Sequence, residues 1–198
     1  MPIVLGYHGC DIKTAQALLG GSSFEISNNN YDWLGSGAYF WEWDVLRAYH
    51  WAKECKGELS SVVGAVIELG NCLDLTTQGG IQAVEAAYSS YANLQRLRNK
   101  PMLENKDAKA GKPGNLALRL LDRAVITHLH ESNKGAEIDY DTVRALLPEG
   151  EELYPNAGFW KKTHVQIAVR KINQIRGVFR VPQNELKQLN ISEAIYHF

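Results

Sequence analysis

The sequence predicts a mixed α+β fold with a single domain, and three observations carry the prediction. Compact apolar or alternating runs, which are typical of strands, lie near both ends of the chain, at residues 3–7, 38–41, 62–69, 163–169 and 178–181. Between residues 80 and 150 the apolar residues instead recur mainly at helical spacing. The length of 198 residues suits one domain with a sizeable core.

Composition and charge narrow the class of protein. Apolar residues make up 45% of the chain and charged residues 22%, as in an ordinary globular protein. The net charge of -1 gives no overall basic field, although a local basic patch would suffice for nucleic acid. No run is long and apolar enough to cross a membrane, and the N-terminus lacks a signal peptide's charged leader. Three cysteines without framework spacing fit a reduced compartment, so we expect a cytoplasmic protein with no membrane partner.

The first strand, at residues 3–7, ends in His8-Gly9, and a helix follows. Asp11 can cap this helix, which carries Ile12, Ala15 and Leu18 on one side and ends at Gly20. Residues 22–30 are polar, with three consecutive asparagines, and predict a loop.

An aromatic stretch follows this loop at residues 31–41. It holds five aromatic residues, and Gly35 and Gly37 allow a tight turn before the aromatic strand at residues 38–41. Asp44 can cap the next helix, which runs through Ala52. A turn, an aromatic strand and a capped helix predict one wall of a pocket for a flat ring. An aromatic-rich core hairpin is the alternative.

The middle of the chain predicts a helical insertion at about residues 80–150. Its helical patterns lie at residues 81–94 and 116–130, and we expect a short third helix between Asp141 and Pro148. The polar loop at residues 100–115 carries four lysines, either as a solvated loop or as a phosphate-contacting patch: Lys100, Lys106, Lys109 and Lys112.

Strand character returns at residues 163–169 after a turn-rich aromatic loop. Alternation places Val165, Ile167 and Val169 on one face of this strand. Four residues share the other face: His164, Gln166, Ala168 and Arg170.

These pieces resemble the diphtheria-toxin-like and poly(ADP-ribose) polymerase-like ADP-ribosyltransferases, whose signature is His, Tyr and usually Glu on three strands. The matching features are His8-Gly9, the pattern Gly35-x-Gly37-x-Tyr39-Phe40, and a late strand that presents Gln166. The resemblance covers about residues 1–80 and 154–182 and implies a split mixed β-sheet core. The helical middle matches nothing in it.

The resemblance implies a role for each matching residue. Backbone groups of Gly9 would hold the nicotinamide carboxamide of NAD+, His8 would bind the adenosine ribose, and Tyr39 would stack on the nicotinamide. A second stacking aromatic is expected one helix later, where the family's spacing leads to His50, beside Tyr49 and Trp51. A lone His8 at a strand end could alternatively be a structural histidine.

Gln166 is the departure from the pattern, because it stands where the family usually has Glu. Glutamine keeps an acceptor oxygen but has no charge and cannot serve as a base. Either transfer is slow, or the acceptor needs little activation, or a carboxylate comes from elsewhere, with Glu42 and Glu68 as candidates. Chain elongation without the Glu is not expected. In many relatives the positions of His164 and of the loop before it, here with Trp160, contact the acceptor.

The function expected from the resemblance is mono-ADP-ribosylation of a macromolecule, with NAD+ as substrate and no metal. The acceptor would be nucleic acid, with RNA or DNA slightly favoured, or protein. A transferase of this size resembles the toxin of a bacterial toxin–antitoxin or phage-defence system, which would imply a cognate antitoxin. Two alternatives stay open: a catalytically silent NAD+- or nucleotide-binding module, and an NAD-dependent RNA 2'-phosphotransferase. The pair His128-x-His130 does not share a helix face, so a metal site there is not expected.

Overall fold

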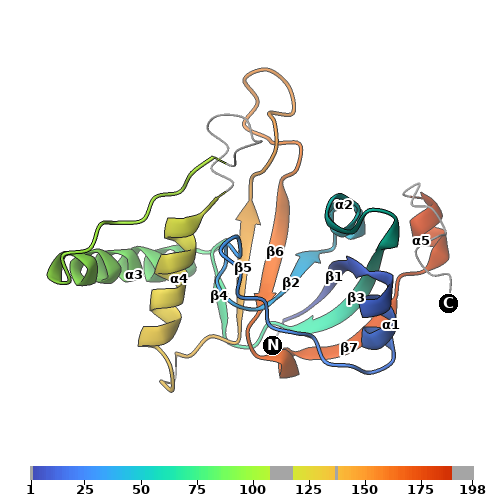
Figure 1. The fold of residues 1–198 in the computed structure, drawn as a ribbon, viewed down its shortest axis with the longest axis horizontal. Helices are drawn as coiled ribbons and strands as arrows, with labels where there is room; N and C mark the ends of the chain where they lie inside the picture. The colour runs from blue at the N-terminus through green and yellow to red at the C-terminus, as the bar shows by residue number, and fades with distance from the viewer. Residues whose placement is uncertain (1, 108–117, 137, 189–198) are drawn as a thin grey trace.

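The computed structural model describes residues 2–107, 118–136 and 138–188, and within them the protein has an α+β fold built on one open sheet of seven strands (Figure 1). The strands are β1 Ile3–Asp11, β2 Ala38–Glu42, β3 Ser60–Glu68, β4 Cys72–Asp74, β5 Thr142–Leu147, β6 His164–Val169 and β7 Ile175–Arg180. The helices are α1 Ile12–Leu19, α2 Val45–Lys56, α3 Gln78–Leu97, α4 Leu120–Ser132 and α5 Gln183–Gln188, with short 3-10 helices at Gly57–Leu59 and Ile172–Gln174.

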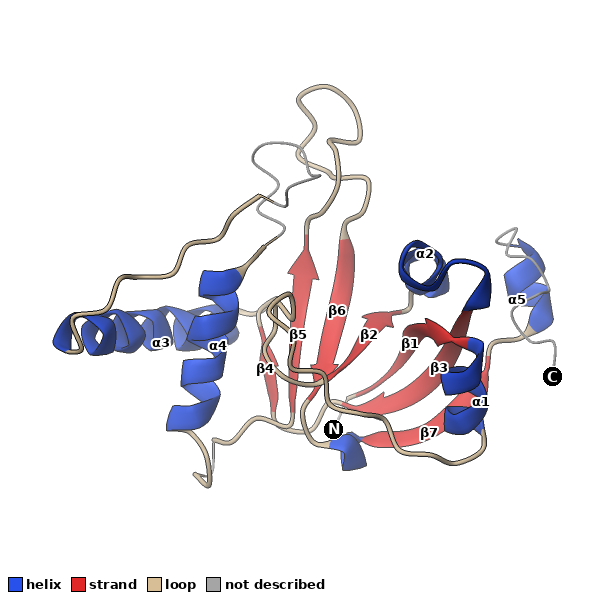
Figure 2. Ribbon diagram, in the orientation of Figure 1, coloured by secondary structure: helices blue, strands red, loops and turns tan. Residues whose placement is uncertain are grey.

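The strand order is β4-β5-β6-β2-β1-β3-β7, and among the strand pairs of the described residues only β4 and β5 run parallel. Nine residue pairs join β1 to β3, whereas only two, Gly6–Glu42 and Tyr7–Trp41, join β1 to β2. The sheet therefore opens between β1 and β2. The strands β4, β5 and β6 fan away from β1, β3 and β7 on the two sides of this opening (Figure 2).

The two faces of the sheet are covered differently. On one face α1 buries Ala15 and Leu18 against a core that includes Phe40 and Ile167. On the other face α2 packs near Trp41, while Ile126 of α4 packs with strands β4, β5 and β6. This second face thus carries a helix at each side, and β2 and β6 lie between them.

Local chemistry fixes where the first two helices begin. Asp11 and Asp44 each accept a hydrogen bond from the backbone amide three residues on, that of Thr14 and of Arg47, at 2.8 Å. Such caps satisfy amides that have no partner within the helix. The predicted caps at both positions are confirmed.

The predicted third helix is wrong, because residues 142–147 form β5. Val143, Ala145 and Leu147 are buried on one face, whereas Leu146 is 55% exposed. This is the two-residue period of a strand. The helical part of the middle is therefore α3 and α4 and ends at Ser132, and β5 belongs to the sheet.

The other predicted elements are present with changed bounds. The strand predicted at 178–181 begins at Ile175, and the helix predicted at 116–130 spans Leu120–Ser132. Lys109 and Lys112 of the predicted lysine loop lie outside the described residues. The alternation predicted for β6 is confirmed at Ile167 and Ala168, which are buried on opposite faces. Among the described helices, none combines the length and the apolar character needed to span a membrane.

Candidate functional site

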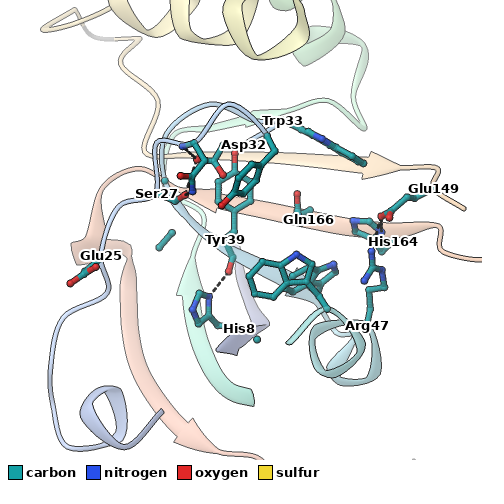
Figure 3. A pocket seen from close by; sticks show the side chains of 17 residues that line it. His8, Glu25, Ser27, Asp32, Trp33, Tyr39, Arg47, Glu149, His164 and Gln166 are labelled. Carbon is teal, nitrogen blue, oxygen red and sulfur yellow. Dashed lines mark hydrogen bonds and ion pairs between the residues drawn. The ribbon is translucent and has the colours of Figure 1, made fainter. Parts of the chain in front are cut away.

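A cavity of about 310 Å³ lies where the sheet opens, between α2 and the loop that precedes β2 (Figure 3). Its lining includes His8 and Gly9 of β1, Tyr39 and Trp41 of β2, and Gln166 of β6. The loop before β2 contributes further side chains to the lining, namely Glu25, Ser27, Asn29, Tyr31, Asp32 and Trp33. The remaining side chains of interest come from α2, the β5–β6 connection and the start of β6: Arg47, Trp51, Glu149 and His164.

The side chain of His8 makes a hydrogen bond that the main chain would make if the pairing of β1 with β2 continued. A continued β1–β2 ladder would pair Gly9 with Tyr39, but the pairing ends at Tyr7 and Trp41. His8 Nδ1 instead donates to the carbonyl oxygen of Tyr39 at 2.8 Å. Burial lowers the pKa of His8, so the ring is neutral at pH 7 and Nε2 carries a lone pair. The ring also packs edge-on against Phe24, so its role is partly structural.

Gly9 turns its backbone groups toward the opening. Trp43 N donates to Leu5 O at 3.0 Å, so the odd-numbered residues of β1 direct their amides and carbonyls toward β2. Gly9 lies two residues beyond Tyr7, the last to pair, and faces the opened part of the sheet. A Cβ at Gly9 would lie 2.3 Å from the carbonyl oxygen of Ala48 on α2. Glycine is therefore needed for the close approach of this helix.

Tyr39 holds the loop that covers the cavity. Its hydroxyl donates to Gly35 O at 2.5 Å and accepts from Leu34 N at 3.1 Å. Burial, followed by the charge of Asp32, raises the pKa of Tyr39, so the hydroxyl remains protonated. Gly35 has φ +81, a conformation that favours glycine, and this turn brings its carbonyl to the hydroxyl.

The covering loop is also fixed from within and from α4. Asp32 is buried and accepts hydrogen bonds from Ser27 Oγ, at 2.7 Å, and from Asn29 N. Arg123 of α4 donates to Asn28 Oδ1 at 2.8 Å. The guanidinium of Arg119 lies 4.3 Å above the ring of Trp33. The helical part of the chain thus contributes directly to the shape of the cavity.

Trp41 and Gln166 face each other across β2 and β6, since they are register partners. The ring of Trp51 on α2 lies 5.6 Å from that of Trp41, at a 45° tilt. Trp41 Nε1 is buried and has no hydrogen-bond partner among the described residues. These indoles and Tyr39 give the cavity several apolar faces on which a flat ring can stack.

A charged cluster closes one end of the cavity. Arg47 Nη2 donates to Glu149 Oε2 at 2.7 Å, and His164 Nδ1 lies 3.9 Å from the same oxygen. The pair Arg47–Glu149 joins α2 to the connection between β5 and β6, 102 residues apart in sequence. The Arg47 guanidinium also lies 5.7 Å from the centre of the Trp41 ring.

Most of the predicted site residues come together, and two lie elsewhere. His8, Gly9, Tyr39, His164 and Gln166 line the cavity. His50 is exposed on α2, and its neighbour Trp51 lines the cavity instead. Trp160 is half-buried on the arm between β5 and β6, bridged to Glu152, and is not part of the lining.

The two candidate carboxylates are occupied elsewhere. Glu42 accepts from Arg144 Nε at 2.5 Å, and Glu68 accepts from Arg176 Nε at 2.6 Å. Neither lines the cavity, whereas Glu25, Asp32 and Glu149 do.

Comparison of the chain with protein-family models, with curated protein sequences and with solved structures gave no match. Within the described residues, no three His, Cys, Asp or Glu side chains gather as metal ligands would.

The sequence interpretation missed two charged residues of the site, Arg47 and Glu149. Arg47 could have been found from the sequence. The cap at Asp44 fixes where α2 begins, and Arg47 and Trp51 lie four residues apart on one face of that helix. Glu149 could not have been found in this way, because only the fold of β5 and β6 brings it to α2.

Proposed function

We propose that the protein is a mono-ADP-ribosyltransferase that transfers ADP-ribose from NAD+ to a macromolecule. One observation carries the proposal: His8 and Gly9 of β1, Tyr39 of β2 and Gln166 of β6 line one cavity at the opening of the sheet. These are the residues matched to the family's signature, and they come from strands far apart in sequence. A core hairpin alone would give no reason for Gly9 and Gln166 to share a cavity with Tyr39.

The lining supports the chemistry of nicotinamide release. Loss of nicotinamide leaves positive charge on the ribose, so the enzyme must fix the leaving ring and orient the sugar. In the proposed complex the backbone of Gly9 holds the carboxamide, while Tyr39 and Trp51 stack on the nicotinamide. His8 Nε2 accepts from a ribose hydroxyl, and Gln166 accepts from the nicotinamide ribose without adding charge.

For the acceptor we favour RNA or another nucleic acid, with protein as the alternative. The arm between β5 and β6 projects beyond the sheet and carries Tyr154 and Phe159, which are 56% and 67% exposed (Figure 1). Exposed aromatic rings suit stacking on unpaired bases. A toxin of a toxin–antitoxin or phage-defence system, acting in the cytoplasm, is the biological role we propose with this activity.

The test is transfer of label from NAD+ carrying radioactive adenylate phosphate to macromolecules of a bacterial lysate. Lysate pre-treated with protease, RNase or DNase identifies the acceptor class. We expect the wild type and the control Tyr88→Ala to label macromolecules, and Tyr39→Ala to label none. Tyr88 is a suitable control because it is 45% exposed on α3, outside this cavity.

A silent NAD+-binding module is the second candidate, and Gln166 favours it because glutamine lacks the charge of the usual Glu. NAD+ binding by the wild type without label transfer would support this module. Absence of both binding and transfer would contradict both candidates.

An RNA 2'-phosphotransferase is a third candidate, and Arg47 is the observation that favours it. That chemistry calls for arginine near a phosphate, and Arg47 lines the cavity. Its charge, however, is already balanced by Glu149 at 2.7 Å. RNA carrying a 2'-phosphate at an internal splice junction tests it: loss of that phosphate on incubation with NAD+ would replace our proposal.

A further inference from the structure

His164 lines the cavity and has one ring nitrogen without a hydrogen-bond partner among the described residues. The side chain is 1% exposed, at the start of β6, and shares a strand face with Gln166. Its Nδ1 donates to the carbonyl oxygen of Lys162 at 2.7 Å. This bond places the proton on Nδ1 and leaves the lone pair on Nε2. Nε2 is buried and has no hydrogen-bond partner among the described residues.

The groups around His164 change its pKa in both directions, and the net effect is to lower it, which keeps the ring neutral at pH 7. Burial is the largest influence and lowers the pKa of His164, and Arg47 lowers it further. The hydrogen bond to Lys162 O and the charges of Glu149 and Asp44 act in the opposite direction. A neutral imidazole with a carboxylate 3.9 Å from its other nitrogen is the arrangement that suits a general base.

We propose that His164 is the catalytic base of the transfer, with Nε2 accepting the proton of the acceptor group. This inference rests on the proposed function and names the group that replaces the missing Glu. The bond between C1' of the nicotinamide ribose and the nicotinamide nitrogen breaks, and its electron pair stays with nicotinamide. An oxygen or nitrogen lone pair of the acceptor forms the new bond to C1'. The acceptor's proton moves to Nε2 and then to water.

The carboxylates of the cavity suit this role less well. Asp32 is committed to Ser27 and Asn29 of the covering loop. Glu149 is already held by Arg47 in an ion pair at 2.7 Å. Glu25 lies at the opposite side of the cavity from His164 (Figure 3). Glu149 is instead a positioning residue, whose charge stabilises the imidazolium that forms when His164 takes the proton.

The decisive experiment combines His164→Ala with NAD+ labelled as above and a bacterial lysate as acceptor. We expect transfer to fall roughly 10²–10⁴-fold, the usual contribution of a general base. NAD+ affinity should stay within about threefold, because the inference assigns His164 to the acceptor. Added imidazole should restore part of the transfer. The matched control His128→Ala removes a histidine of α4 that bonds Ser90, outside the cavity, and should transfer as the wild type does.

Glu149→Gln gives an independent readout that keeps the histidine. Transfer requires neutral His164, so it declines as the pH falls through the pKa of that ring. Since the Glu149 charge raises this pKa, its removal should move the acid limb of the pH profile to lower pH. Unchanged transfer by His164→Ala, or an acid limb that stays in place in Glu149→Gln, would overturn the inference while leaving the proposed function intact. If the wild type transfers no label, the proposed function fails and this inference fails with it.

Discussion

The hydroxyl of Tyr39 donates to the carbonyl oxygen of Gly35, 2.5 Å away, and so ties the strand β2 to the loop that leads into it. The same hydroxyl accepts from Leu34 N. Gly35 in turn lies against α4, where a Cβ would come within 3.3 Å of Ile126. The floor of the cavity, its covering loop and the helical part of the chain therefore form one packed unit.

Removing this hydroxyl should loosen the covering loop while leaving the aromatic ring. In Tyr39→Phe, Leu34 N and Gly35 O lose a buried partner, which we expect to cost about 1–3 kcal/mol of the free energy of unfolding. NAD+ affinity should fall as well, because the loop that covers the cavity is less ordered. Urea unfolding and NAD+ titration measure the two effects, with Tyr88→Phe on α3 as the control. Equal stability of Tyr39→Phe and wild type would show that the two hydrogen bonds contribute nothing net.

The contact between Arg119 and Trp33 should tune NAD+ binding from outside the cavity. A cation above an indole contributes about 0.5–2 kcal/mol. We therefore expect Arg119→Ala to weaken NAD+ binding roughly two- to thirtyfold, because Trp33 lines the cavity and loses its support. Isothermal titration measures the affinity. Arg98→Ala, at the exposed end of α3, is the control. Equal NAD+ affinities of Arg119→Ala and the wild type would show that this contact at the start of α4 does not influence the site.

The sequence was sufficient where a local rule decides the structure. Asp11 and Asp44 fixed two helix starts, and alternation assigned the faces of β6. It was insufficient at β5, because four of its six residues are apolar and so short a segment does not distinguish a strand from a buried helical turn. The partners that make it a strand, β4 and β6, are distant contacts that no local pattern contains.

The predicted position of the second stacking aromatic differs by one residue from the aromatic that lines the cavity, again because a local count could not include the surrounding fold. On a helix, one residue of displacement rotates a side chain by about 100°. The family spacing leads to His50, but α2 begins after a turn in which Trp43 has φ 55, and Trp51 lines the cavity. The cap at Asp44 could have set this phase, whereas counting from Tyr39 could not.

Trp51 should therefore contribute to NAD+ affinity, whereas the exposed Trp43 should not. Loss of a stacked indole in Trp51→Ala should weaken NAD+ binding roughly tenfold or more, since aromatic stacking contributes about 0.5–1.5 kcal/mol beyond burial. Trp43→Ala is the matched control, because Trp43 is 64% exposed and lies outside the lining. Tryptophan-independent detection, such as calorimetry, avoids a trivial fluorescence change. A larger effect in Trp43→Ala than in Trp51→Ala would contradict our placement of NAD+.

Gly9 should tolerate no side chain. In Gly9→Ala the new methyl group would lie 2.3 Å from Ala48 O, so α2 has to move, and such overpacking typically costs about 1–3 kcal/mol. Gly79→Ala on α3 is the matched control, because nothing lies within 4 Å of its Cβ and alanine favours a helix by about 0.5–1 kcal/mol. Chemical unfolding compares them. We expect Gly9→Ala to lower the free energy of unfolding and Gly79→Ala to raise it. Equal stability of Gly9→Ala and the wild type would show that the close approach of α2 does not require glycine.

His130 should make the fold sensitive to acid. Burial, together with the charge of Arg170, lowers the pKa of His130 to about 4, and both ring nitrogens lack a hydrogen-bond partner among the described residues. The unfolded chain, with a pKa of 6.5, therefore binds this proton first, so stability falls as the pH drops from 6.5 toward 4. The full loss is on the order of 3 kcal/mol.

The variant His130→Phe should remove this share of the acid sensitivity. Phenylalanine keeps a ring against Tyr140, whose centre lies 6.2 Å from that of the imidazole, and it has no proton to gain. The free energy of unfolding, measured in urea between pH 7 and pH 4, should fall less steeply in the variant than in the wild type. The remaining slope comes in part from His8 and His164, whose pKa values burial also lowers. Identical slopes would show that His130 is protonated as readily in the folded protein as in the unfolded chain, which the burial of this α4 residue beside Gly35 argues against.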